Sequence, residues 1–203
     1  LLRDLALAKH SIHMEYYIFE LDNIGLQVIN LLEQKAAEGV HVRLIADSFG
    51  SPDLVKYMRK QKDSKIDFHA FLPVTFTSLA NSNYRNHRKI CVIDGLVGYV
   101  GGINISDKYI NSADSTNKMY WRDTSLRVAG LAINLLQVSF WSSWNQTDGE
   151  SFYLEDGYLQ ALQENTDVRG KAGVGFVSSD PASVGPFNME ALLIAIGEAN
   201  TKI

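Results

Sequence analysis

Apolar positions along the chain follow two periods, one of two residues and one near 3.6 residues, and the two periods alternate. The shorter period is typical of strands, and the longer one of amphipathic helices. Strands are predicted over residues 11–19, 40–46, 66–71, 88–94, 97–100, 120–128 and 172–178. Helices are predicted over residues 1–9, 22–38, 52–62, 131–144, 155–164 and 188–200, with a helical turn over 106–110. This alternation predicts an α/β sandwich in which helices flank a mixed, mostly buried β-sheet.

A short stretch in the middle of the chain carries the clearest candidate chemistry. His87, Lys89 and Asp94 have the spacing H-x-K-x-x-x-x-D, and Gly101-Gly102 and Asn104 follow a predicted hairpin. Because alternate side chains of a strand share a face, His87 and Lys89 project side by side, whereas Asp94 points to the opposite face. The glycine pair lets backbone come close to a ligand. An imidazole, an ammonium and a carboxamide together suit a phosphate diester.

These residues resemble the signature of the phospholipase D superfamily, H-x-K-x-x-x-x-D followed by G-[GS]-x-N. Four flanking segments are similar to the bacterial cardiolipin synthase branch, namely Glu15-Tyr16-Tyr17-Ile18-Phe19, Asp47-Ser48-Phe49-Gly50-Ser51, Arg85-Asn86-His87-Arg88-Lys89 and Trp121-Arg122-Asp123. The similarity runs from the first residues to about Trp144, which is most of the chain. It implies a phospholipase D-like sandwich and phosphodiester chemistry that needs no cofactor.

The residue chemistry and the resemblance assign roles at a candidate catalytic site. A neutral nitrogen of His87 can attack phosphorus and form a phosphohistidine. Lys89 supplies positive charge to the phosphoryl oxygens, Asn104 donates an amide hydrogen bond to them, and Gly102 lets the phosphate approach the backbone. The resemblance implies that a histidine from a second motif acts as the general acid.

Two carboxylates complete the candidate catalytic set. Asp94 belongs to the motif, but its place on the opposite strand face predicts a structural role in bonding turn backbone. Asp123 is expected to hold the other nitrogen of His87, as carboxylates do in other sites with an oriented histidine. A surface ion pair between Asp123 and Arg122 is the alternative.

The end of the chain is similar to its beginning, which predicts an internal repeat. Residues 199–203 (ANTKI) align with residues 8–12 (AKHSI), and Leu192-Leu193 then falls on Leu1-Leu2. The resembled family is built from two such repeats, each with one motif. The expected organisation is therefore a first repeat lacking its first strand, a linker with a short helix, and the opening strand and helix of a second repeat, over residues 1–150, 151–171 and 172–203.

That organisation makes the chain part of a longer protein, and it leaves one sheet position unfilled. We expect the strand at residues 172–178 to occupy this position, either in its own chain or swapped into a neighbouring copy, because an unpaired strand edge invites pairing.

Composition narrows the environment and the partners. The net charge of −4 gives no sign of the excess positive charge that is typical of nucleic-acid-binding proteins, so no nucleic-acid partner is expected. Cys91 is the sole cysteine, which fits a reducing compartment, and its apolar strand predicts a buried, inert thiol. No apolar run reaches the length of a membrane span. The other four histidines lie on different predicted elements, so no metal site is expected.

The leading hypothesis is a phosphatidyltransferase that makes cardiolipin from phosphatidylglycerol at the bacterial cell membrane. Its partners would be the phospholipid, the membrane surface, and a second repeat or second copy that supplies the general-acid histidine. We expect the apolar side chains of the loop over residues 72–85 either to form a wall for acyl chains or to pack under the loop. The alternatives are a single-motif phosphodiesterase or nuclease that dimerises, and a catalytically incomplete fragment that is inactive as a monomer.

Overall fold

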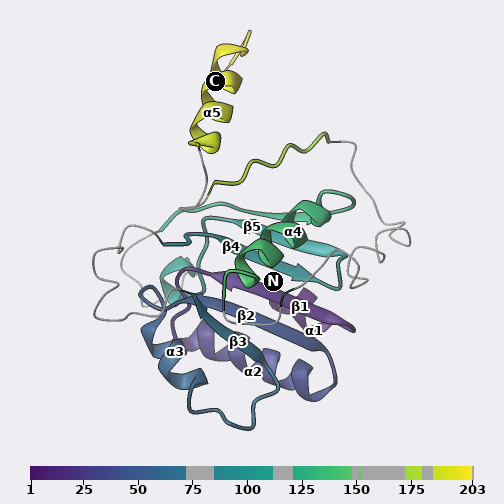
Figure 1. The fold of residues 1–203 in the computed structure, drawn as a ribbon, viewed down its shortest axis with the longest axis vertical. Coiled ribbons are helices and arrows are strands. Elements are labelled where there is room, and N and C mark those ends of the chain that lie inside the picture. Colours follow the sequence, from purple (N-terminus) through teal and green to yellow (C-terminus); the bar gives the residue numbers. More distant parts are fainter. Residues whose placement is uncertain (72–84, 112–120, 148–150, 152–171, 180–184, 203) are drawn as a thin grey trace.

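The computed structural model describes residues 1–71, 85–111, 121–147, 151, 172–179 and 185–202. Among these residues six strands form one sheet, in the order β3-β2-β1-β4-β5-β6 (Figure 1). The strands are β1 Ser11–Tyr16, β2 His41–Asp47, β3 Asp67–Phe71, β4 Lys89–Ile93, β5 Val97–Gly101 and β6 Ser125–Ala129. β1, β2 and β3 pair in parallel, whereas β4 pairs antiparallel with β1 and β5, and β6 with β5. The predicted mixed sheet is confirmed.

The helices follow local signals in the sequence. They are α1 Leu2–Ala6, α2 Asn23–Ala37, α3 Pro52–Met58, α4 Ile133–Trp144 and α5 Phe187–Gly197, with a short 3-10 helix, η2 Asp107–Tyr109. Asp22 caps α2, since its side chain accepts a hydrogen bond from the amide of Gly25 at 3.1 Å. Gly39 follows α2 with a φ of 94°, which favours glycine after a helix. None of the helices in the described ranges combines the length and hydropathy needed to cross a membrane.

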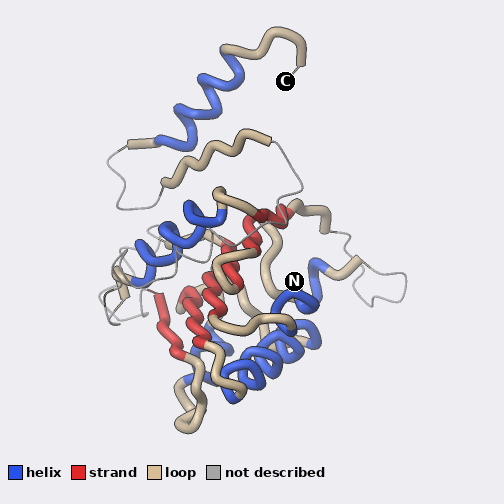
Figure 2. The backbone as a smooth tube through the Cα atoms, turned by 90° about the vertical axis from the view of Figure 1, so that its right-hand side faces the viewer, coloured by secondary structure: helices blue, strands red, loops and turns tan. Residues whose placement is uncertain are grey.

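Different helices cover the two faces of the sheet, as Figure 2 shows. On one face, Leu5 of α1 and Leu32 of α2 share a buried cluster with Cys91 of β4. On the other face, Val92 of β4 packs against Leu136 of α4. The alternation predicted for this strand is therefore confirmed. Cys91 is a buried thiol, as expected, and its burial raises its pKa.

Beneath α4 the sheet carries buried polar side chains, and His13 is the most enclosed of the histidines. Its Nε2 lies 3.1 Å from Nη1 of Arg43, which can only donate, so Nε2 accepts and Nδ1 carries the proton. Nδ1 then donates to Oε1 of Gln137 at 3.0 Å, and the ring stacks on Phe140 at 4.9 Å. Burial lowers the pKa of His13 to about 3, so the imidazole is neutral.

The prediction of a strand over residues 172–178 is wrong, because this segment is irregular and pairs with none of the six described strands. Gly173 and Gly175 weaken its strand preference, and the surroundings of both are open. The segment nevertheless contacts the domain. Ser178 accepts a hydrogen bond from Nη2 of Arg88 at 2.7 Å, and Phe176 packs on the cluster beneath α4.

Several boundaries also differ from the sequence prediction. β1 ends at Tyr16 rather than Phe19, β6 begins at Ser125 rather than residue 120, and α1 ends at Ala6. Helix α5 is confirmed, and its apolar side chains are mostly exposed. Most of the loop predicted over residues 72–85, the helix over 155–164 and the linker over 165–171 lie outside the described residues.

We expect the stability of the domain to depend on pH through His13. Its pKa is about 3 in the folded chain and 6.5 without the protein environment, so only the unfolded chain gains a proton between these values. The free energy of unfolding should therefore fall as the pH drops from 6.5 towards 3, by up to about 1.4 kcal/mol per pH unit. Thermal unfolding of wild type and His13→Gln at pH 7 and pH 4.5 checks this. Their difference should shrink at pH 4.5, and an unchanged difference would contradict the prediction.

Candidate active site

His87 and Lys89 of the motif lie where β4 begins, beside the carboxyl end of β1. Lys89 pairs with Tyr16 in the antiparallel ladder, and the amide of Tyr17 donates to the carbonyl of Arg88 at 3.2 Å. Nζ of Lys89 lies 2.8 Å from Nδ1 of His87 and donates to the carbonyl oxygen of His87 at 2.7 Å. The two side chains therefore project together, with the lysine buried and the histidine exposed.

Asn104 lies in the segment that follows β5, and its side chain reaches the backbone just after β1. Its Oδ1 accepts a hydrogen bond from the amide of Ile18 at 3.1 Å, and its Nδ2 donates to the hydroxyl of Tyr109 at 2.7 Å. The side chain is buried. Because the nitrogen of a carboxamide carries two hydrogens, Asn104 is anchored at the end of β1 with one donor still available.

Burial and neighbouring charges shift both titratable groups of the motif. Burial lowers the pKa of Lys89 to about 8, and the carboxylate of Asp123 opposes this shift. Burial, together with the Lys89 charge, lowers the pKa of His87, whereas Asp47 raises it. At pH 7 the imidazole is neutral and the ammonium is charged. These are the states needed for attack on phosphorus and for stabilising the phosphoryl oxygens.

Asp94 points away from His87, as the alternation predicts, and it binds backbone. Its Oδ1 accepts from the amides of His10 and Ser11 at 2.7 and 2.8 Å, and its Oδ2 from Lys9 at 2.8 Å. These hydrogen bonds support the predicted structural role, although the backbone is that of the α1–β1 connection rather than of its own turn. Asp94 has a φ of 53°, a conformation that aspartate tolerates better than most residues.

Asp123 contacts Gly102 rather than His87. Its Oδ1 accepts from the amide of Thr124 at 2.7 Å, and a Cβ at residue 102 would overlap its carboxylate. No hydrogen bond joins the described side chains of Asp123 and His87, and Asp123 lies outside the strand that was predicted to position it, since β6 begins at Ser125. The amide of Gly102 donates to the carbonyl of Thr124 at 2.9 Å, so Gly102 offers space rather than a backbone donor.

Two residues outside the motif, Tyr17 and Asp47, help to build the site, and the sequence pattern alone predicts a role for neither of them. The ring of Tyr17 lies 4.4 Å from that of His87 and 5.3 Å from Nζ of Lys89. Asp47, at the end of β2, is buried, and its Oδ1 lies 3.7 Å from Nη1 of Arg85. The available signal was that both residues lie near the carboxyl ends of strands joined by a helix, because such strands are usually parallel neighbours whose carboxyl ends meet.

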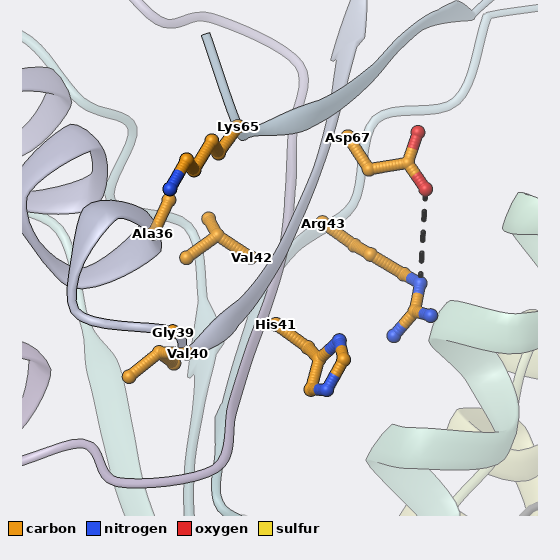
Figure 3. A pocket seen from close by; sticks show the side chains of 8 residues that line it. All are labelled: Ala36, Gly39, Val40, His41, Val42, Arg43, Lys65 and Asp67. Carbon is orange, nitrogen blue, oxygen red and sulfur yellow. Dashed lines mark ion pairs between the residues drawn. The ribbon is translucent and has the colours of Figure 1, made fainter.

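A pocket lies near the start of β2, away from the motif, and Figure 3 shows the residues that line it. Lys65 runs toward Ala36, away from His41 and Arg43, whose Nε lies 3.9 Å from the carboxylate of Asp67. The charged groups of Lys65 and Arg43 point in different directions, so this pocket is not assigned as a phosphate site. Within the described ranges, no group of three His, Cys, Asp or Glu side chains is placed to hold a metal ion.

Comparison with known proteins identifies the relatives of this chain. A family model described as "Cardiolipin synthase, PLD-like domain" matches residues 1–128. The cardiolipin synthase of Alkalihalophilus pseudofirmus is 40% identical over 205 residues, covering 100% of this chain and 40% of that protein. Cardiolipin synthase 2 of Bacillus cereus is 43% identical over 185 residues, covering 89% of this chain and 35% of that protein. The chain thus spans well under half the length of these curated relatives.

Solved structures share the fold at low sequence identity. The phospholipase D family member Nuc from Salmonella typhimurium has a TM-score of 0.53 at 18% identity, covering 74% of this chain and 88% of its own. NucT from Helicobacter pylori has a TM-score of 0.54 at 15% identity, covering 73% and 87%. Sheet, helices and motif together define a phospholipase D-like domain. The chain belongs to the family of cardiolipin synthase PLD-like domains.

Replacement of Asp94 by alanine should destabilise the domain, although Asp94 makes no direct contact with His87. Three backbone amides would lose a charged acceptor, so the free energy of unfolding should fall by roughly 2–4 kcal/mol. Urea unfolding followed by tryptophan fluorescence measures this. Asp94→Asn keeps one acceptor oxygen and should lose less, and Asp63→Ala, at an exposed position, is the control. Equal stability of Asp94→Ala and wild type would refute the structural role.

Proposed function

We propose that this domain carries the nucleophile half of a phosphatidyl-transfer site, and that the whole protein makes cardiolipin from phosphatidylglycerol. The observation that carries the proposal is the neutral imidazole of His87 beside the charged ammonium of Lys89, whose Nζ lies 2.8 Å from Nδ1. The names of the relatives support the substrate class.

In the proposed reaction, Lys89 releases the ring of His87, and the unprotonated ring nitrogen attacks the phosphorus of phosphatidylglycerol. The bond from phosphorus to the oxygen of the headgroup glycerol breaks. The leaving glycerol alkoxide takes a proton from the general-acid histidine of a second motif. Lys89 moves from Nδ1 of His87 to a phosphoryl oxygen, and Asn104 donates its remaining N–H there. A hydroxyl of a second phosphatidylglycerol then attacks the phosphorus and gives its proton to the second-motif histidine, which acts as the general base. The bond from phosphorus to His87 breaks, cardiolipin forms, and both histidines return to their starting states. Water as the acceptor would make the same site a phospholipase.

The proposal includes the domain organisation and the setting. Residues 1–150 form the first repeat, 151–171 a linker, and 172–203 the opening of a second repeat whose motif provides the general acid. A second copy of the chain is the other possible source of that histidine. The substrate is a phospholipid, so the whole protein works at the bacterial membrane surface, with its catalytic part on a reducing, cytoplasmic-type side.

A second candidate is a single-motif phosphodiesterase that completes its site by dimerising. It is favoured by the similarity in size, since the match covers 88% of Nuc and 87% of NucT. The net charge of −4 argues against nucleic acid as the substrate, because such proteins normally concentrate positive charge.

Replacement of His87 by alanine in the full-length protein should abolish phosphatidyl transfer, because alanine has no side-chain nitrogen that can attack phosphorus. Incubation with radiolabelled phosphatidylglycerol followed by acid lability of the protein-bound label tests the intermediate. Wild type should retain an acid-labile, alkali-stable label, and His87→Ala none. His10→Ala removes an exposed histidine and should behave as wild type. Normal turnover by His87→Ala would end the assignment.

The isolated 203-residue chain should be nearly inactive on lipid as a monomer. It has one motif, and the missing general acid is typically worth roughly 10²- to 10⁴-fold in rate. Transfer assays on size-separated monomer, beside the full-length protein, measure this loss. Full activity of the monomer would show that the chain supplies both proton transfer and the nucleophile.

A further inference from the structure

An exposed aromatic ring stands close to the motif in a fixed position. Phe49 is 64% exposed and belongs to the turn of residues 47–51, which joins β2 to α3. Oδ1 of Asp47 accepts from the amides of Phe49 and Gly50 at 2.8 and 3.0 Å, and the carbonyl of Asp47 accepts from the amide of Ser51 at 2.9 Å. The backbone that carries this ring is therefore held by a buried carboxylate.

The 47–51 turn is attached to the residue that contacts His87. A Cβ at Gly50 would overlap the carbonyl oxygen of Tyr17, so the two backbones touch there. Oγ of Ser51 donates to the same carbonyl at 2.9 Å and accepts from the amide of Phe19 at 2.8 Å. The ring of Tyr17 in turn lies 4.4 Å from that of His87. The position of the turn is thereby coupled to the position of the nucleophile.

Arg85 connects Phe49 to the motif from the other side. Its guanidinium lies 5.6 Å from the centre of the Phe49 ring and 3.7 Å from Oδ1 of Asp47. Its side chain is only 10% exposed, and it precedes His87 by two residues. An apolar ring, a partly buried cation and the imidazole thus occupy neighbouring places on one rim of the sheet.

We propose that Phe49 binds the apolar part of the lipid substrate, where the glycerol backbone meets the acyl chains, while the phosphate lies at His87 and Lys89. The inference rests on the proposed function, which supplies a phospholipid substrate. A phospholipid joins a charged phosphate directly to apolar chain, and this rim offers both kinds of partner. Because hydrogen bonds already hold the turn, little conformational entropy is lost when the ring binds. Aromatic side chains are well suited to such amphiphilic boundaries.

Two substrates of the full-length protein test this assignment. With phosphatidylglycerol vesicles, Phe49→Ala should lose roughly tenfold in kcat/KM, mainly through KM, as expected for one apolar contact. With water-soluble bis(p-nitrophenyl) phosphate, which lacks acyl chains, Phe49→Ala should stay within about twofold of wild type. Phe49→Leu keeps an apolar side chain and should retain most of the activity on lipid.

The control is Leu7→Ala, because Leu7 is also 64% exposed but lies just beyond α1, at the opposite end of β1 from His87. This variant should match wild type on both substrates. Equal losses of Phe49→Ala on both substrates would show that the ring only supports the fold, and unchanged kinetics on lipid would show that it does not bind substrate; either result overturns the inference. If wild type cleaves the soluble diester but transfers no lipid, the proposed function fails first.

Discussion

The hydrogen bonds that Asp94 accepts from residues 9–11 are the constraint on which the site depends. They join the end of β4 to the start of β1 and so fix the register in which Lys89 pairs with Tyr16. A shift of one residue would turn every side chain of β4 to the other face of the sheet. Lys89 would then leave the end of β1, and His87 would lose its neighbour. The aspartate of the motif acts on the chemistry through strand register.

Once the register is fixed, the site holds two nitrogen bases in different charge states. Burial lowers the pKa of both His87 and Lys89, but their ordinary values differ so much that the imidazole is neutral while the ammonium remains charged. The carboxylates act on different partners, since Asp123 favours the charge on Lys89 and Asp47 favours protonation of His87. The predicted pairing of Asp123 with His87 is thus replaced by two longer-range interactions.

Predictions that rest on the period of a single strand agree with the structure. The shared face of His87 and Lys89 and the opposite direction of Asp94 follow from β4 alone, and the apolar residues of β4 agree with them because they pack alternately into the clusters on the two faces of the sheet. Predictions that need a partner strand failed. Residues 172–178 have a strand-like pattern but pair with no described strand, and β6 begins after Asp123, later than the sequence indicates. Strand formation depends on an available edge, which a local pattern does not reveal.

The sequence by itself determined the α/β class, the order of the described helices and strands up to residue 147, and the motif with its two-faced geometry. Each of these is encoded within a few neighbouring residues, as a period, a cap or a fixed spacing. Only the tertiary structure placed Tyr17, Asp47 and Phe49 around His87. These residues are far from His87 in sequence, and they meet it because β2 and β4 pair with opposite edges of β1, so that the end of β2 and the start of β4 lie on the same rim.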